Sequence, residues 1–409
     1  HPDVARTLYI AGNNFFKRGD FGSAEPLLLK ALAIRDKSLG PEHLDIENSV
    51  NSLASLYYNQ DLYEKAAPYY LRALTIRERT VGADHPDTST SLNRLAIIYF
   101  KQELYNKAEP LYLRALDIRE KALGPEHSET ATSLNNLAEL FRAQGKYSKA
   151  EPLYLRSLAI REKALGPEHP DTSSSLNNLA GLYRDQGRYS KAEPLYLRAL
   201  AITEKALVPE HPWAAISRTR LAQFYEDQGI YSKAEPLLLR TLDIHEKAFD
   251  PNHPNTAISL SNLALLYVNQ DLYGKAEPFF LRALAIREKA LGPEHPLIAF
   301  SLGYLGSLYF DQGLYNKAGA LLQRALDIKE KVLGPNHPDT ATSLNDLGLL
   351  YVYHGFYDKA GPLLQRALDI NEKVLGPNHP DTATILNNLA VLNERLGLFH
   401  KLKPLYQRS

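Results

Sequence analysis

Ten histidines in this chain occur beside proline and acidic residues, a setting that could serve metal binding or acid–base chemistry. They follow one another at steps of 42 residues and are His1, His43, His85, His127, His169, His211, His253, His295, His337 and His379. A reactive site needs different groups converging on one point, whereas these are copies of one loop that lie a repeat apart. We therefore interpret them as structural residues that order the turn through hydrogen bonds. His245, His354 and His400 are out of this register, and we expect them on the surface.

Other reactive groups and motifs are missing from the sequence. The chain has no cysteine, which excludes disulfides, thiolate catalysis and zinc sites with cysteine ligands. It also has no phosphate-binding G-x-x-x-x-G-K-[ST] loop, His-Glu-x-x-His zinc motif or G-x-S-x-G elbow. We expect a protein that is not an enzyme and that holds no metal and no cofactor.

The charge and hydropathy of the chain restrict its partners. Lys plus Arg and Asp plus Glu both number 47, and such neutrality argues against nucleic acid as a partner. The sequence has no run of eighteen apolar residues and no basic-then-apolar start, so we expect no membrane partner and no signal peptide, and a cytoplasmic protein. Methionine is absent, which suggests a fragment of a longer protein.

The 42-residue spacing of the histidines is the period of an internal repeat, and it decides the fold. We predict one solenoid over residues 1–409. Its repeats are 1–42, 43–84, 85–126, 127–168, 169–210, 211–252, 253–294, 295–336 and 337–378, with a partial tenth at 379–409.

Each repeat has the pattern of two helices, as the fourth repeat illustrates. Its first apolar stripe, at i, i+3, i+4 and i+7, consists of Leu134, Leu137, Ala138 and Phe141. Gly145 can end this helix in the left-handed conformation. We expect Ser148 to cap the second helix in a capping box with Glu151, and Gly166 to end it. Small residues at Ala138, Ala150 and Ser157 mark where the helices approach closely.

The order and spacing of Leu137, Ala138, Phe141, Ala150, Tyr154 and Ser157 resemble the tetratricopeptide repeat. With L-G-P-E-H-P-D-T and S-L-N-N-L-A, the unit is similar to the 42-residue variety found in kinesin light chains and bacterial signalling proteins. The near-identity of the units favours a bacterial repeat array. The resemblance implies an all-α, right-handed superhelical solenoid of helix-turn-helix repeats, in which the first helices line a concave groove.

If that groove binds a peptide, the ninth and tenth positions of each repeat would line it. Asparagine is frequent there, and a primary amide offers two donors and an acceptor to an extended backbone. The candidates are Asn93, Asn135, Asn136, Asn177, Asn178 and Asn262. The alternative is that these amides bridge neighbouring helices and stiffen the stack.

The sixteenth position varies between repeats, as a selective surface would. Arg142 and Arg184 at this position could form a basic strip with Arg94 and Arg220, because arginine grips carboxylates bidentately. Apolar side chains would flank that strip as pockets, namely Phe100, Val268, Phe310 and Val352. Alternatively, these arginines are solvated or paired within the chain.

The sixth repeat departs from the pattern of the others. Val208 replaces the glycine that ends the preceding helix, and Trp213 takes the place of an aspartate that we expect to cap the next helix. Thr219 and Arg220 replace an asparagine pair. A local change of superhelix pitch, a special contact point, or drift compensated by tryptophan packing would each explain this.

These patterns predict a protein-interaction scaffold that holds a peptide or partner protein, an acidic one being the favoured ligand. The alternative is a sensor array that regulates an NTPase or protease in a larger polypeptide. Self-association through apolar ends of the solenoid is a further alternative, because no polar capping helix is evident.

Overall fold

The computed structural model describes residues 2–17, 20–206, 211–248, 252–377, 379–402 and 405. Over these ranges the chain forms nineteen α-helices, one turn of 3-10 helix and no strand. The predicted all-α architecture of tandem helix pairs is confirmed. Val208, which the sequence analysis singled out, lies outside the described residues.

Long helices of 15 to 19 residues alternate as first and second helices of successive repeats. The first helices are α1 (Pro2–Lys17), α3 (Leu44–Asn59), α5 (Pro86–Lys101), α7 (Ser128–Ala143), α9 (Pro170–Asp185), α11 (Pro212–Glu226), α13 (Pro254–Val268), α15 (Pro296–Asp311), α17 (Pro338–Tyr353) and α19 (Pro380–Arg395). The second helices are α2 (Phe21–Ser38), α4 (Tyr63–Val81), α6 (Tyr105–Ala122), α8 (Tyr147–Leu165), α10 (Tyr189–Ala206), α12 (Tyr231–Ala248), α14 (Tyr273–Leu291), α16 (Tyr315–Val332) and α18 (Tyr357–Val374), followed by η1 (Phe399–Lys401).

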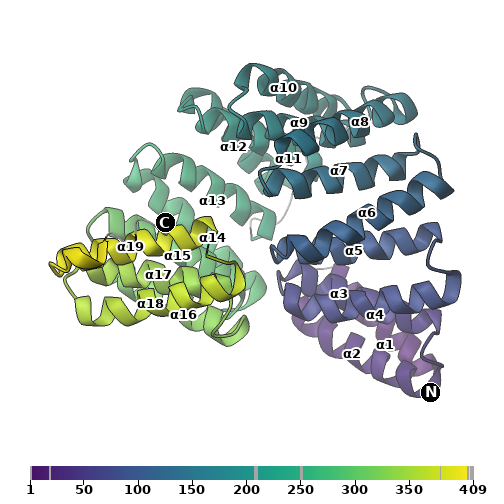
Figure 1. Ribbon diagram of the computed structural model, residues 1–409, viewed down its shortest axis with the longest axis horizontal. Helices are drawn as coiled ribbons and strands as arrows, with labels where there is room; N and C mark the ends of the chain where they lie inside the picture. The colour runs from purple at the N-terminus through teal and green to yellow at the C-terminus, as the bar shows by residue number, and fades with distance from the viewer. Residues whose placement is uncertain are drawn as a thin grey trace. The chain divides into compact units, whose positions relative to one another are not determined.

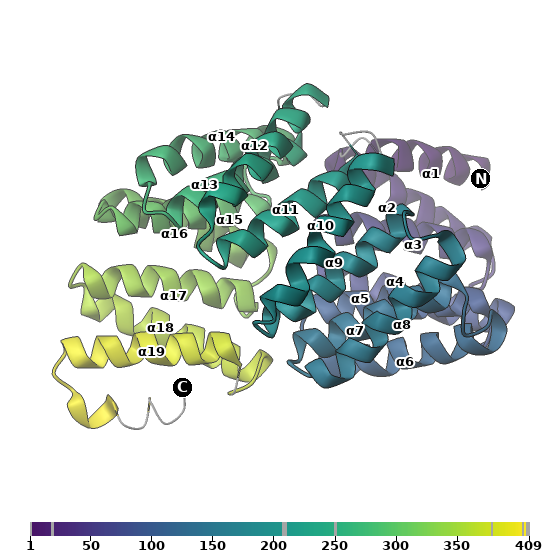
Figure 2. The same cartoon turned by 90° about the horizontal axis from the view of Figure 1, so that it is seen from above.

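The helix pairs form two compact units, His1–Phe224 and Tyr225–Ser409. In the first unit α2, α4, α6 and α8 each pack against the first helix of their own repeat and of the next, as α6 does with α5 and α7 (Figure 1). In the second unit α14, α16 and α18 do the same, and the first helices α15, α17 and α19 lie side by side (Figure 2). A helix pair that cannot bury both of its apolar stripes alone therefore buries them against its neighbours.

Histidine caps the starts of the first helices, because its ring accepts a hydrogen bond from a backbone N–H that has no partner within the helix. In nine of them, α3 to α19, the histidine Nδ1 accepts from the backbone N–H two residues on, at 3.1–3.2 Å. This satisfies one of the donors that every helix start leaves open. The structural interpretation of the histidines is confirmed. The prediction that the third residue of a repeat, usually aspartate and here Trp213, caps the first helix is wrong. The cap is the histidine: the backbone N–H of Trp213 donates to His211, as the backbone N–H of the aspartate does in other repeats.

Six of the second helices start without a side-chain cap, contrary to the predicted capping box: α4, α6, α8, α14, α16 and α18. Helix α2 differs, because the Asp20 carboxylate accepts from the N–H of Ser23 at 3.0 Å. Helix α8 begins at Tyr147, after Lys146, which makes no side-chain cap bond, so Ser148 already lies inside the helix. The reason is the tight turn at Gly145, whose φ of 69° lets Lys146 N–H bond to the carbonyl of Phe141 at 2.8 Å. The chain enters the second helix directly from this turn, one residue before the serine.

The helices of a repeat meet at small residues, as predicted. Ala138, Ala150 and Ser157 are fully buried. The Ser157 hydroxyl also donates to the carbonyl of Ala131 at 2.8 Å, so this small polar group is satisfied inside the contact. Close approach of the two helices depends on these short side chains.

A buried basic side chain near the end of the second helix joins each of several repeats to the next. Arg161 donates to the carbonyl of Asp171 and to Ser175 Oγ, both at 3.0 Å. The residues that make this kind of bond to the next first helix are Arg35, Arg119, Arg161, Arg287 and Lys329, which we call the inter-repeat basic residues. Burial lowers the pKa of four of them, Arg119, Arg161, Arg287 and Lys329.

His245 occupies the same position in the sixth repeat, so its expected place on the surface is wrong. It is 6% exposed, and its Nδ1 lies 2.8 Å from Ser259 Oγ, the bond that an arginine makes elsewhere. His354 and His400 are exposed, as predicted. The burial of His245 follows from its register in α12, which faces the next first helix.

The junction of the fifth and sixth repeats exchanges this arrangement for another. Thr203 stands where the inter-repeat basic residue is expected, and Arg218 on α11 stands where most other repeats have a core leucine. The Arg218 side chain is fully buried and bonds to Glu204 at 3.0 Å, but its two terminal nitrogens have no partner among the described residues. At this junction the buried guanidinium therefore comes from the first helix α11 and not from the second helix α10, and it makes fewer hydrogen bonds than Arg161 does.

Removing a histidine cap should destabilise the helix start. We predict that His127→Ala costs about 1 kcal/mol of unfolding free energy, because the Glu129 N–H loses its acceptor. Thermal unfolding and amide hydrogen exchange of the first turn of α7 measure this. His127→Asp should restore most of the loss, since aspartate is a preferred cap. An equal loss in both variants would contradict a capping role.

Removing an inter-repeat basic residue should cost more than removing an exposed ion pair. Arg119→Met leaves the Glu129 carbonyl, Ser89 and Ser133 without their charged donor, for an expected loss of about 2–3 kcal/mol. The matched control Arg156→Met removes the exposed pair with Glu120 and should cost less than about 1 kcal/mol. Urea unfolding followed by circular dichroism gives both values. The reverse order would refute this role of the buried arginine.

Candidate ligand-binding face

Adjacent first helices in the first unit are joined by polar side chains that form one surface. We call this surface, built by the ninth, tenth, thirteenth and sixteenth residues of each repeat, the first-helix face. Asn178 Nδ2 donates to Asn135 Oδ1 at 3.1 Å, and Arg142 Nε donates to Asp185 at 2.6 Å. Both bonds run between α7 and α9, so the face is connected across repeats.

The ninth-position asparagines lie between helices. Asn93, Asn135 and Asn177 are at most 9% exposed. Asn93 donates to Ser133 at 3.2 Å and Asn177 to Ser217 at 3.0 Å, in each case on the next first helix. In this structure these amides therefore make the bridging contacts of the alternative interpretation.

The tenth-position residues are more accessible. Arg94 is exposed and Asn136 and Arg220 are half-buried, and none of these three side chains has a hydrogen bond or ion pair with the described residues. Asn178 is half-buried and bonded to Asn135. Asn262 is half-buried and lies in the second unit, so the structure does not group it with the others.

The sixteenth-position arginines of the strip are held by acidic neighbours. Arg142 pairs with Glu139 at 3.3 Å and with Asp185 at 2.6 Å, and Arg184 pairs with Asp185 at 3.2 Å. Burial disfavours the charged form of Arg142, but the two carboxylates outweigh it, so its pKa lies above the usual value. In the free protein, therefore, Arg142 and Arg184 are both paired within the chain, which was the alternative to a ligand-binding basic strip.

The predicted apolar pockets are only partly present. Phe100 is half-buried against Tyr105, with ring centres 5.9 Å apart. Phe310 lies in the second unit and contacts Tyr353 edge-on at 5.3 Å. Val352 is 2% exposed and is therefore a core residue, so its expected role as a surface pocket is wrong.

The sequence analysis missed two acidic residues of α7 and α9, Glu139 and Asp185, which hold Arg142. It named Tyr154 of α8 only as part of the repeat pattern, whereas its hydroxyl donates to Glu139 at 2.5 Å. Gly181 leaves space at the thirteenth position, where a Cβ would lie only 3.0–3.2 Å from the Arg142 guanidinium. Comparison of that position across the repeats would have shown the glycine, because other repeats have larger residues there.

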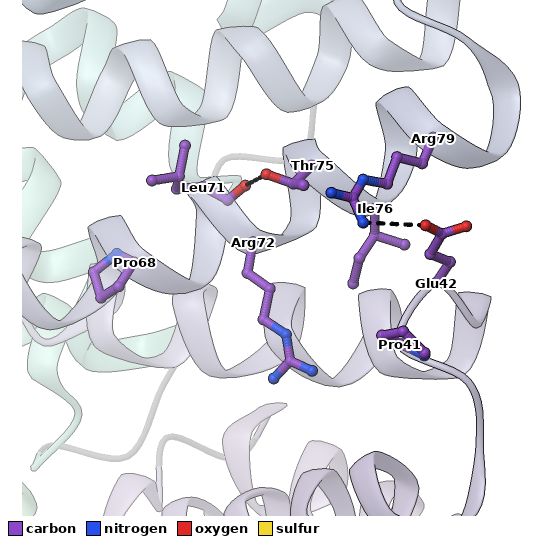
Figure 3. Close-up of a pocket in the computed structure, with 8 residues that line it drawn as sticks. All are labelled: Pro41, Glu42, Pro68, Leu71, Arg72, Thr75, Ile76 and Arg79. Atoms are coloured by element: carbon purple, nitrogen blue, oxygen red, sulfur yellow. Dashed lines mark hydrogen bonds and ion pairs between the residues drawn. The ribbon is translucent and has the colours of Figure 1, made fainter.

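The second helices present a different surface, with a row of exposed leucines beside ion pairs. One recess there, of about 380 Å³, is lined by Pro68, Leu71 and Ile76 among others. Figure 3 shows the 3.1 Å ion pair of Arg79 and Glu42 at one end of the recess and Pro68 and Leu71 at the other. Its charged groups are thus already engaged within the chain.

The described residues contain no group of three acidic or histidine side chains that could hold a metal ion. Among the same residues, no helix is both long and apolar enough to span a bilayer.

Glu226 at the sixteenth position of the sixth repeat titrates unusually. Burial, with the nearby charge of Asp227, raises its pKa from 4.5 to about 7, although Asn269 acts in the opposite direction. The folded protein therefore holds this proton to higher pH than the unfolded chain does. Linkage makes stability fall as pH rises from 4.5 through about 7.

We predict that Glu226→Gln removes this loss, because glutamine has no proton to lose. The variant should be more stable than the original chain at about pH 8 and equal to it near pH 4. Urea unfolding at both pH values is the measurement. A constant difference at both pH values would show that the carboxyl does not titrate in this window.

Comparison with protein-family models matches the tetratricopeptide repeat over residues 3–79, 45–121, 87–163, 129–205, 171–238, 213–289, 260–331, 298–360 and 351–409. No curated protein matches the chain.

Solved structures of similar proteins include a kinesin light chain-like protein from Podosopora anserina with nearly identical TPR-like repeats. It is 30% identical, with 50% of this chain and 97% of that chain covered and a TM-score of 0.44. A Rap protein complexed with Competence and Sporulation Factor is 16% identical. The match covers 92% of this chain and 99% of that chain, with a TM-score of 0.52. A STAND signal-transduction ATPase with a tetratricopeptide repeat sensor, from Pyrococcus horikoshii, is 19% identical. The match covers 91% of this chain and 54% of that chain, with a TM-score of 0.54. The last two are similar in fold alone.

The family matches span nearly the whole chain. The chain therefore belongs to the tetratricopeptide repeat family, whose repeats are generally protein-interaction modules.

Proposed function

We propose that the chain is a non-enzymatic scaffold that binds a peptide or protein segment along the first-helix face of the first unit. One observation carries this proposal. The arginines at equivalent positions on the second helices are paired within the chain, whereas the first-helix face carries accessible polar side chains without such partners.

On the second helices, the pairing follows the repeat. Arg114, for example, reaches Glu78 on the preceding second helix at 2.6 Å. Seven such arginines lie 2.5–2.7 Å from an acidic residue of the previous repeat: Arg72, Arg114, Arg156, Arg198, Arg282, Arg324 and Arg366. A ligand would have to break these pairs in order to use the same charges.

On the first-helix face of the first unit, Arg94 and Arg220 are accessible cations, and Asn136 is an accessible amide. A guanidinium binds carboxylates with two parallel hydrogen bonds, and an amide can bond to both groups of a peptide backbone. An extended peptide with acidic residues matches this set. We therefore propose an acidic segment as the ligand.

A second candidate function is a sensor array within a larger protein. The STAND protein from Pyrococcus horikoshii, which shares the fold, carries its tetratricopeptide repeats as a sensor. The Rap protein of the same fold was solved with Competence and Sporulation Factor. In both candidate functions the repeats act by binding.

Selection from a phage-displayed random peptide library on the immobilised chain tests the proposal. We expect the enriched peptides to be rich in Asp and Glu and to bind Arg94→Glu about tenfold more weakly, because one charge-assisted bond is lost. Binding should also weaken with added salt. Fluorescence anisotropy of the enriched peptides measures both effects.

The control is Lys121→Glu, which makes the same charge change in the same repeat, on the exposed side of α6, where Lys121 pairs with Asp117. It should leave the affinity unchanged. Equal loss in both variants would reduce the effect to net charge. A library that yields no binder would overturn the proposal of a peptide ligand and leave the sensor array as the better candidate.

A further inference from the structure

The ninth repeat differs from the others where its first helix ends and the turn to its second helix follows. The seventeenth, eighteenth and twentieth residues of a repeat lie there, and in the second and seventh repeats they are asparagine, glutamine and leucine. The ninth repeat has three aromatic residues at these positions, Tyr353, His354 and Phe356. No other repeat has an aromatic residue at any of the three. In an array of nearly identical repeats, this change singles out one turn.

The three rings are accessible to solvent. Tyr353 is 50% exposed and Phe356 is 47% exposed, and His354 is exposed as well. Leu314, in the turn of the preceding repeat, is 41% exposed. Exposed apolar side chains that are scattered singly need no explanation, whereas a group of them marks an interaction site.

These rings contact one another and two rings of the preceding repeat. His354 stacks on Phe356 with ring centres 4.7 Å apart, and it meets Tyr315 edge-on at 5.5 Å. Phe310 meets both Tyr315 and Tyr353 edge-on, at 5.7 and 5.3 Å. We call these five residues the turn-edge aromatic cluster. Because most of its neighbouring rings are close to perpendicular, the cluster has notches between them and not one flat surface.

A recess of about 240 Å³ lies where Tyr315 and His354 meet. The two rings and Leu314 give it apolar walls, and Asn316 and Lys317 give it polar groups. Gly313 also lines it, in a turn with a φ of 73°. The recess therefore joins ring faces to hydrogen-bonding groups.

The polar groups around the cluster are mainly donors. The Tyr315 hydroxyl and the Asn316 amide make no hydrogen bond with the described residues. Lys317, Lys359 and Arg395 each lie 5.1–6.0 Å from the centre of an aromatic ring and have no ion pair within the described part of the chain. Ammonium and guanidinium groups donate hydrogen bonds and accept none. A matching ligand has to supply compact apolar groups together with acceptors.

We propose that the turn-edge aromatic cluster binds a proline-rich segment of a partner protein in the polyproline II conformation. This goes beyond the proposed function, which concerns the first unit. The proline rings pack against the exposed ring faces, and the recess between Tyr315 and His354 takes one of them. Proline has no N–H, so the segment presents carbonyl groups, which accept from the donors around the cluster. Its conformation exists before binding, so little entropy is lost on binding.

Other peptide conformations match the cluster less well. An α-helix bonds most of its carbonyl groups internally and would leave the donors without acceptors. An ordinary extended peptide also brings N–H groups, for which Lys317, Lys359 and Arg395 offer no acceptor.

The test uses substitutions that the chain itself supplies. Tyr353→Asn, His354→Gln and Phe356→Leu each introduce the residue that the second and seventh repeats have at that position, so the fold should be kept. The probe is fluorescein-labelled decaproline amide, and a labelled Gly-Ser peptide of the same length is the peptide control. We expect decaproline to bind the original chain and each substitution to weaken binding about fivefold to tenfold, because a ring contact is lost. Fluorescence anisotropy measures this, and three separate variants keep the test independent of the stability of any one.

Tyr304→Asn is the matched control variant. Tyr304 is 44% exposed, lies in the same unit, and stands where several other repeats have asparagine. Its ring stacks on Phe280 at 5.9 Å and is not part of the cluster. Tyr304→Asn should therefore leave the affinity for decaproline unchanged.

The inference is overturned if decaproline does not bind the original chain at about 1 mM, if the Gly-Ser peptide binds equally well, or if Tyr304→Asn weakens binding as much as Tyr353→Asn does. Light scattering tests a different occupant. An oligomer of the original chain that Tyr353→Asn dissociates, without binding of decaproline, would assign the cluster to a contact between two copies and overturn the proline-rich ligand. Peptides from the library selection should bind all three cluster variants as they bind the original chain, so the proposed function is judged separately.

Discussion

The buried inter-repeat basic residues impose the main constraint on this structure. A guanidinium or ammonium placed between two repeats has to be satisfied on all sides, because leaving a buried charge without partners is very unfavourable. Arg161 achieves this with the carbonyl of Asp171 and with Ser175, both on the following first helix. The hydrogen bonds have strict distances and directions, so each such side chain sets where the next helix starts. Apolar packing alone tolerates more variation in this register.

The junction between the fifth and sixth repeats shows what happens when the constraint is relaxed. Thr203 cannot reach the next helix and instead bonds within α10, and Arg218 enters the core from the other side with two nitrogens unpartnered among the described residues. Asn177 and Tyr196 have unpartnered atoms near the same junction. The polar network of the first unit is thus least complete where the repeats differ most from one another. An incomplete network is also where a ligand has most to contribute.

Much of the fold was predictable because it depends on local signals that recur every 42 residues. Histidine and proline at the helix start, glycine in the turn, and alanine at the close contacts each act on neighbouring residues, so their effect can be inferred without a structure. The cap of the second helix was predicted two residues late, at Ser148 instead of Lys146, because the turn after Gly145, and not a serine cap, determines it. His245 was misplaced because its burial depends on the next repeat, not on its own sequence neighbours.

By itself, the sequence determined the family, the helical repeat and the approximate helix limits, because ten copies of one pattern repeat the same local physics. It also indicated which helix carries the variable polar residues. Only the tertiary structure decided which of those residues are available. Arg142 and Arg94 are the same residue type on equivalent helices, yet Arg142 is paired with Asp185 and Arg94 is exposed. The reason is that the partners of a side chain on the first-helix face come from the next repeat, about 42 residues away. Contacts over that distance follow from how the helices stack and not from the residues beside each position.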